Sequence, residues 1–238
     1  MQACNVLNDL RKNGQLCDVV LRVEDGHFTV HRAIMSACSP YFRALFTNGM
    51  HETDKREVFI PGVTADMMGL IVDYAYTRET TVTGENVERL LPAADQFHVL
   101  GLVKRCCDYL LNCLDWDNCI GIRNFSRTYF CTSLERAAHH FILEHFTEIA
   151  AKSNELLMLS DDGMVEIISS DDLNVKNEEI VFDCITRWIN HDPENRKQHI
   201  AKLLKCIRLG LLTTAYFVET VKVLSNSSLS TLIYLRPT

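Results

Sequence analysis

The stretch that decides the fold of the first part of the chain is Leu-Cys-Asp-Val-Val-Leu-Arg-Val-Glu-Asp-Gly-His-Phe-Thr-Val-His-Arg, residues 16–32. The apolar residues Val19, Leu21 and Val23 alternate with Val20, Arg22 and Glu24. This alternation is the period-two pattern of a strand with one buried face. Asp25-Gly26 then supplies a two-residue turn, and Phe28 and Val30 continue the alternation. The stretch therefore predicts a β-hairpin.

The residues that follow the hairpin predict one more strand and several helices. Residues 57–60, Glu-Val-Phe-Ile, form a short run that is closed by Pro61-Gly62, which predicts a third strand. Ser39-Pro40 is an N-cap followed by proline at the first helical position, and Asn48-Gly49 is a helix end. Thr64 caps a second helix. The expected buried stripes of these two helices are Phe42, Leu45 and Phe46, and Met67, Leu70, Ile71 and Tyr74.

From residue 85 onward the apolar spacing is almost purely helical. A boundary is expected near residues 114–117, where polar residues interrupt the pattern. We therefore predict an α+β domain followed by an all-α domain. The expected segments after the boundary are residues 120–129, 134–149, 155–159 and 164–168, a helix capped by Asn177, and another that begins at Asp192-Pro193.

Composition and charge exclude several classes of protein. The 238 residues carry a net charge of −7, which disfavours binding to a phosphate backbone. The ten cysteines contain no C-x-x-C pair, which excludes a zinc finger by spacing. The N-terminus does not resemble a secretory signal, so a reducing intracellular compartment is expected. The longest uncharged stretch, residues 223–235, is too short to cross a bilayer, so we expect no membrane contact.

Catalytic motifs are absent from the sequence. It has no phosphate-binding loop, dinucleotide fingerprint, nucleophile elbow or H-E-x-x-H. His139, His140 and His145 form the densest histidine cluster, but 139 and 140 point about 100° apart on a helix. We interpret the cluster as a solvated or half-buried helix face. A catalytic Cys–His pair stays open, because such partners need not be adjacent. The sequence predicts a protein that is not an enzyme and needs no cofactor or metal.

Ordered motifs along the chain resemble a BTB/POZ domain followed by a BACK domain, the front half of the kelch-like family. The resemblance covers roughly residues 3–223, and it implies a BTB/POZ domain over 1–113 and a BACK domain over 114–223. Residues 224–238 read as a divergent tail without the glycine and tryptophan pattern of a kelch propeller. The motifs are residues 16–19, 28–32, 39–46, 73–77 and 90–97 for BTB, and residues 118–120, 172–175, 178–182 and 187–189 for BACK.

The resemblance implies a cytoplasmic substrate adaptor of a cullin-3 RING ubiquitin ligase. Such a protein dimerises through BTB, with itself or with related kelch-like proteins, and binds the cullin-3 N-terminal domain. Met50, His51 and Glu52 stand where the family has a hydrophobic-x-Glu motif for cullin-3. The remaining residues that the resemblance assigns are Phe97 and His98 for cullin binding, and Val6, Leu7, Leu10, Asp18 and His31 for the dimer interface.

Several alternatives stay open at this point. Asp18 and His31 could instead be a polar pair that stabilises the fold at a strand–helix junction. The apolar N-terminal segment could pack on its own domain. The chain could be a dimeric scaffold or a dominant-negative form that delivers no substrate. A BTB transcription regulator is disfavoured by the missing zinc fingers and the negative charge. Redox sensing would need a cation beside a thiol, as Lys104 and Arg105 are beside Cys106 and Cys107.

Overall fold

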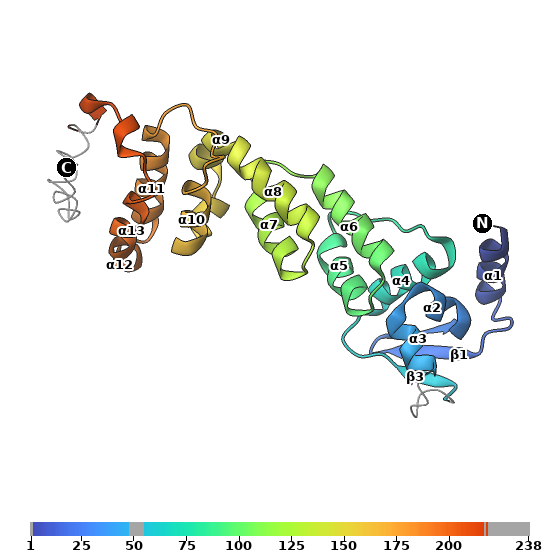
Figure 1. Cartoon of the computed structure of the whole chain (residues 1–238). Helices are drawn as coiled ribbons and strands as arrows, with labels where there is room; N and C mark the ends of the chain where they lie inside the picture. Colours follow the sequence, from blue (N-terminus) through green and yellow to red (C-terminus); the bar gives the residue numbers. More distant parts are fainter. Residues whose placement is uncertain (1, 48–54, 217, 219–238) are drawn as a thin grey trace. The chain divides into compact units, whose positions relative to one another are not determined.

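The computed structural model describes residues 2–47, 55–216 and 218, with side chains from residue 5 onward (Figure 1). The chain divides into two compact units, Met1–Cys113 and Leu114–Thr238, and each is described by itself. The first unit is α+β. Its elements are α1 (Gln2–Lys12), β1 (Val19–Val23), β2 (Gly26–Val30), α2 (Arg32–Cys38), α3 (Pro40–Thr47), β3 (Glu57–Phe59), α4 (Ala65–Thr77), α5 (Val87–Gln96) and α6 (Leu100–Asn112).

A three-stranded sheet with the order β2-β1-β3 forms one layer of this unit. β1 pairs with β2 antiparallel and with β3 parallel, and Leu21 is opposite both Phe28 and Val58. The predicted inner residues Val19, Leu21 and Val23 are all buried. Helix α4 packs against the sheet at β2 (Figure 1). The period-two alternation of the sequence is thus confirmed as a sheet with one buried face.

The turn of the hairpin differs from the prediction by one residue. Val23 pairs with Gly26, so the two turn residues are Glu24 and Asp25, and Gly26 belongs to β2. The Asp25 side chain accepts a hydrogen bond from the backbone N–H of Ala65 at 2.8 Å, at the start of α4. A Cβ at Gly26 would lie 2.8 Å from that of Ala65. Glycine at 26 therefore allows α4 to approach the strand, and it does not serve the turn.

The core of the first unit is aromatic where α3 meets the end of α5. Phe42 stacks on Phe46 and on Phe97, with ring centroids 6.1 and 5.5 Å apart. All three side chains are buried. Leu45, which the spacing placed in the same stripe, is only half-buried. The predicted start of α3 at Ser39-Pro40 is confirmed, while Asn48-Gly49 lies outside the described residues.

The second unit is helical over its described residues up to 216. Its core surrounds Trp188, which is buried and donates a hydrogen bond from Nε1 to the backbone carbonyl of Leu159 at 3.0 Å. The elements are α7 (Cys119–Thr128), α8 (Thr132–Glu144), α9 (Phe146–Lys152), η1 (Glu155–Met158), α10 (Asp161–Ile168), α11 (Glu179–His191), α12 (Pro193–Arg196), η2 (Lys197–His199), α13 (Ile200–Leu204) and η3 (Leu209–Leu211).

Three predictions for this unit need correction. The single segment expected over 134–149 is divided at His145, because Asn174 donates to the carbonyls of Leu143 and Glu144, where α8 ends. The segment expected as a helix over 155–159 is a short 3-10 helix. Glu178 occupies the N-cap position of α11, one residue after Asn177. The predicted start at Asp192-Pro193 is confirmed.

An ion-pair network connects α7, α8 and α10. Glu166 accepts two hydrogen bonds from Arg127, at 2.7 and 3.2 Å, and forms an ion pair with Arg123. Arg127 also donates to Glu135 at 2.7 Å. The two guanidinium groups hold the pKa of Glu166 at about 2, below its ordinary value of 4.5. The side chain of Arg123 is 1% exposed, so Glu166 balances a buried charge.

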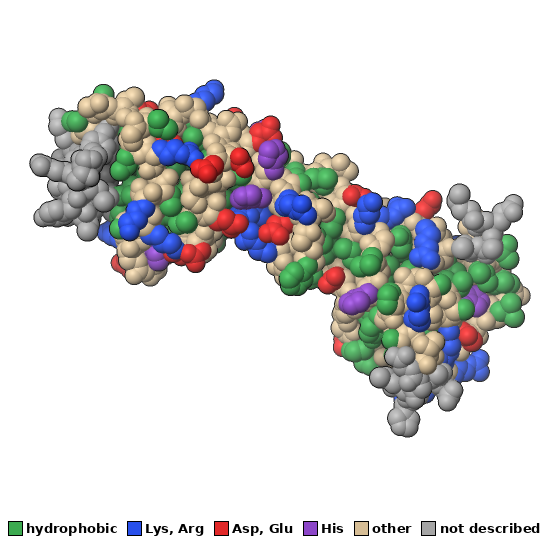
Figure 2. Space-filling model, in the orientation of Figure 1, with side chains coloured by type: hydrophobic (Ala, Val, Ile, Leu, Met, Phe, Trp, Pro, Cys, Tyr) green, Lys and Arg blue, Asp and Glu red, His purple; other side chains and the backbone are tan. Residues whose placement is uncertain are grey.

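The surface carries charges of both signs. On the face shown in Figure 2, Lys and Arg side chains are interspersed with Asp and Glu over the described residues of both units. Within residues 2–47 and 55–216, no helix combines the length and the apolar character that crossing a bilayer requires.

Candidate functional site

The turn between α5 and α6 presents one residue outward between two buried ones. Phe97 and Val99 are buried, whereas His98 is exposed and has a positive φ of 52°. The backbone N–H of His98 donates to the carbonyl of Asp95 at 2.9 Å, and the Nδ1 atom of its ring also contacts that carbonyl, at 2.8 Å. Leu100, at the start of α6, is 70% exposed. The turn therefore holds a polar ring and an apolar side chain at the surface.

Ser39 connects this turn to the start of α3. Its hydroxyl accepts a hydrogen bond from the backbone N–H of Phe42 at 3.2 Å and donates one to the carbonyl of Phe97. Ser39 is fully buried. The ring of Tyr41 packs edge-on against Phe97, with centroids 5.1 Å apart, and burial raises the pKa of its hydroxyl. One serine thus fixes α3 and the His98 turn relative to each other.

The predicted cullin contacts are only partly described. Met50, His51 and Glu52 lie outside the described residues, between Thr47 at the end of α3 and Lys55. His98 is at the surface, as a direct contact requires. Phe97 is fully buried, so its side chain can support the turn but cannot touch a partner in this conformation. The exposed Leu100 was missed by the sequence reasoning, which searched for buried stripes rather than for leucines outside them.

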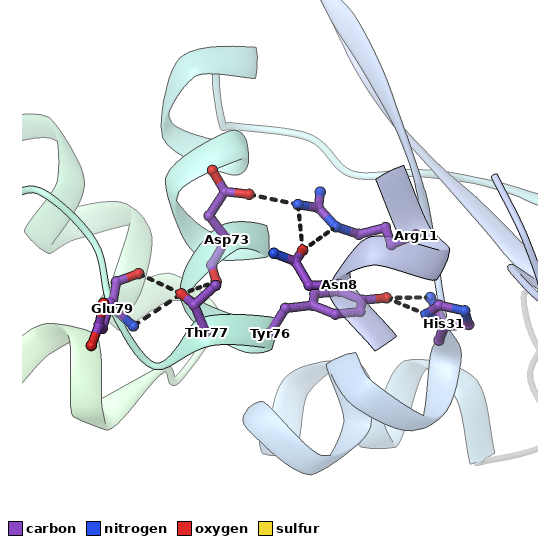
Figure 3. Close-up of polar contacts among 7 residues, drawn as sticks. All are labelled: Asn8, Arg11, His31, Asp73, Tyr76, Thr77 and Glu79. Carbon is purple, nitrogen blue, oxygen red and sulfur yellow. Dashed lines mark hydrogen bonds and ion pairs between the residues drawn. The ribbon is translucent and has the colours of Figure 1, made fainter. Parts of the chain in front are cut away.

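The second candidate surface is the outer side of α1. Val6 is 58% exposed, and Leu7 and Leu10 are half-buried. Asn8 and Arg11 lie on another side of the helix, toward α4, where Arg11 contacts Asp73 (Figure 3). The helix thus contacts α4 through the polar side chain of Arg11, and it leaves Val6 exposed and Leu7 and Leu10 partly accessible. Figure 2 shows hydrophobic side chains at the surface of this unit, on the side where Figure 1 shows α1.

Asp18 and His31 both bind elements of their own domain. Asp18 accepts a hydrogen bond from the backbone N–H of Arg32 at 2.8 Å, at the first residue of α2. His31 is buried, and its Nδ1 lies 2.7 Å from the hydroxyl of Tyr76 (Figure 3). Its Nε2 lies 3.1 Å from the carbonyl of Gln15. Each residue thus supports the fold through its own partners in the domain. The assignment of both residues to a dimer interface stays a prediction.

Tyr76 is the residue of this region to which the sequence analysis gave no role. Its hydroxyl accepts a hydrogen bond from the backbone N–H of His31 at 2.8 Å, and burial raises its pKa to about 12. The hydroxyl therefore stays protonated and can donate to Nδ1 of His31. The sequence signals were its place in the motif 73–77 and in a predicted helix, whose expected buried stripe contained Tyr74 instead. A tyrosine in a helix is equally typical of plain packing.

The polar groups that could carry chemistry are scattered. The described residues contain no group of three or more His, Cys, Asp or Glu side chains that could hold a metal ion. His139 is half-buried with a pKa lowered by burial, and His140 is exposed, as expected for a helix face. Cys106, one of the two thiols next to cations in the sequence, is fully buried.

Comparisons with known proteins match both units. The model of the BTB/POZ domain matches residues 7–114, and that of BACK (BTB And C-terminal Kelch) matches residues 119–222. Mouse Kelch-like protein 17 is 39% identical over 215 residues, covering 90% of this chain and 33% of the relative. Human Kelch-like protein 3 is 41% identical over 221 residues, covering 93% and 38%. The chain therefore spans little more than a third of the length of these relatives.

A solved structure, the BTB domain of zebrafish PATZ1, is 30% identical. It covers 46% of this chain and 88% of its own, with a TM-score of 0.42.

Proposed function

Because the chain is a BTB domain followed by a helical BACK region and is 39–41% identical to kelch-like proteins, we propose that it acts as a dimeric, non-catalytic adaptor that recruits cullin-3 to a ubiquitin ligase. The observation that carries the proposal is the ordered match of both domains. We expect the adaptor to work in the cytoplasm, and within the family we expect kelch-like protein 10 to be its nearest member.

The proposed cullin surface combines the α5–α6 turn with the segment after α3. His98 and Leu100 are both exposed, two residues apart, and the buried Ser39 bond keeps the turn fixed relative to α3. Met50 and Glu52 belong to the sequence that follows α3 directly. An apolar side chain that fills a pocket, with a neighbouring carboxylate to add directional hydrogen bonds, is a common anchor in protein interfaces.

The proposed dimer surface is the outer side of α1. An 11-residue helix is too short to be stable alone in water and depends on tertiary packing. Its inner side packs on α4, while Val6 is 58% exposed. Burial of Val6, Leu7 and Leu10 against a second copy would remove this apolar surface from water.

The proposal is tested by calorimetric titration of the full chain with the cullin-3 N-terminal domain. The double variant Met50→Ala, Glu52→Ala is expected to bind about ten- to a hundredfold more weakly, because a buried methionine contributes about 1.5–3 kcal/mol. Met158→Ala is the matched control, since Met158 is 75% exposed in the second unit. It should bind like the wild type.

Unchanged affinity of the double variant would refute the assignment of the contact. A wild-type chain that forms a dimer but does not bind the cullin-3 domain would refute the adaptor role and favour a dimeric scaffold.

A further inference from the structure

Among the described side chains, the guanidinium group of Arg11 makes the polar contact that joins α1 to α4. Nη2 of Arg11 lies 2.7 Å from Oδ1 of Asp73 on α4 and 2.9 Å from Oδ1 of Asn8. Nε of Arg11 donates to the same oxygen of Asn8 at 3.1 Å. The guanidinium also lies over the ring of Tyr76, 4.9 Å from its centroid. Figure 3 shows Arg11 between α1 and α4 with these partners around it.

The clamp formed by Arg11, Asn8, Asp73 and Tyr76 is largely out of water. The side chain of Arg11 is 13% exposed, Asn8 is 8% exposed and Tyr76 is 1% exposed. Only the carboxylate of Asp73 is well exposed, at 56%. Desolvation strengthens the interaction of a cation with an aromatic ring. The planar fork of arginine can contact two oxygens and stack on a ring together, which lysine cannot do.

The clamp also determines which side of α1 is turned outward. At about 100° per residue, Asn8 and Arg11 lie within about 60° of each other. The side formed by Val6, Leu7 and Leu10 is centred roughly 120–130° away from them. Because Arg11 is bound both to Asp73 of α4 and to Asn8 of its own helix, the clamp fixes the rotation of α1 about its axis. In this orientation Val6 is exposed, and Leu7 and Leu10 are half-buried beside it, as a prearranged strip.

We propose that Arg11 is a positioning residue for dimerisation, which orients α1 so that a second copy of the chain can bind its apolar side. The inference rests on the proposed dimerisation and adds the residue that prepares the interface. Each dimer contains the clamp twice. Loss of Arg11 therefore releases α1 in both copies. Dimerisation must then order two α1 helices that the clamp holds in place in the wild type, which weakens the dimer.

The test compares Arg11→Ala with Lys12→Ala in the full chain. Lys12 is the next residue of the same helix, carries the same charge and is exposed, so its removal controls for charge and helix propensity. The dimer dissociation constant is measured by sedimentation over a dilution series. Hydrogen exchange of the amides of α1 and α4 is measured on the same samples.

Arg11→Ala should raise the dissociation constant about ten- to a hundredfold and accelerate exchange in α1 but not in α4. Lys12→Ala should change the constant less than about twofold. Arg11→Lys, which keeps the charge but not the fork, should fall between Arg11→Ala and the wild type.

A dimer that is equally tight with Arg11→Ala, beside faster exchange in α1, would overturn the positioning role and leave dimerisation intact. A wild-type chain that stays monomeric throughout would overturn both.

Discussion

Replacement of Ser39 by alanine tests whether the α5–α6 turn is held by α3. The hydroxyl accepts the backbone N–H of Phe42 and donates to the carbonyl of Phe97, and it is fully buried. Loss of the N-cap bond costs about 1 kcal/mol. A buried carbonyl that loses its donor costs about 1–3 kcal/mol more. We therefore expect Ser39→Ala to destabilise the first unit by about 2–4 kcal/mol.

Ser160→Ala is the matched control. Ser160 caps α10 by accepting the backbone N–H of Gly163 at 3.1 Å, and it is exposed. Ser160→Ala removes only this N-cap bond, so it should lower the stability of the second unit by about 1 kcal/mol. The difference between the two variants then measures the bond to Phe97.

The placement of the two tryptophans allows each unit to be followed separately in the full chain. Trp116 and Trp188 both belong to the second unit, so tryptophan fluorescence during urea unfolding reports that unit alone. Hydrogen exchange of the buried amides of β1 and α4 reports the first. If Ser39→Ala destabilises its unit no more than Ser160→Ala destabilises the other, Ser39 does not hold the turn.

Two further predictions concern stability. The pKa of Glu166 is lowered from 4.5 to about 2, so its contribution to the stability of the second unit is complete above pH 4.5 and is lost as the pH falls toward 2. Glu166→Gln should therefore flatten this part of the curve of urea stability against pH. An unchanged curve would exclude the ion pairs as the cause of the pH dependence. Gly101→Ala would place a Cβ 2.0 Å from the hydroxyl oxygen of Tyr74 and should destabilise the first unit by about 1–3 kcal/mol. Adding Tyr74→Phe to the same chain removes that oxygen and should restore part of the lost melting temperature. A lack of rescue would contradict the clash.

Local patterns in the sequence were sufficient wherever neighbouring residues decide the structure. The alternation at Val19, Leu21 and Val23 predicted the hairpin, and Ser39-Pro40 predicted the start of α3, because a strand face and an N-cap depend on residues close in sequence.

The errors arose where distant residues decide. Glycine at 26 resembles a turn residue, yet its reason is the approach of Ala65. The break after α8 depends on Asn174, about thirty residues away.

The candidate surfaces could be predicted in the same partial way. The resemblance assigned Val6, Leu7 and Leu10 to a dimer interface and His98 to a cullin contact, and the structure shows that Val6 and His98 are exposed. No local pattern distinguishes Arg11 from the other surface arginines, because its partner Asp73 is 62 positions away. Phe97 illustrates the opposite limit. A motif indicates that a residue lies near an interface, but only packing shows whether its side chain reaches the surface.

The parallel pairing of β3 with β1 has a consequence for the order of folding. β1 and β2 are adjacent in sequence and can pair as a hairpin within roughly 1–10 microseconds. β3 pairs with the same strand across a much longer loop, which α2 and α3 must shorten first. During synthesis the edge of β1 therefore stays unpaired until residue 59 has left the ribosome, and for that interval it is open to pairing with strands of other chains.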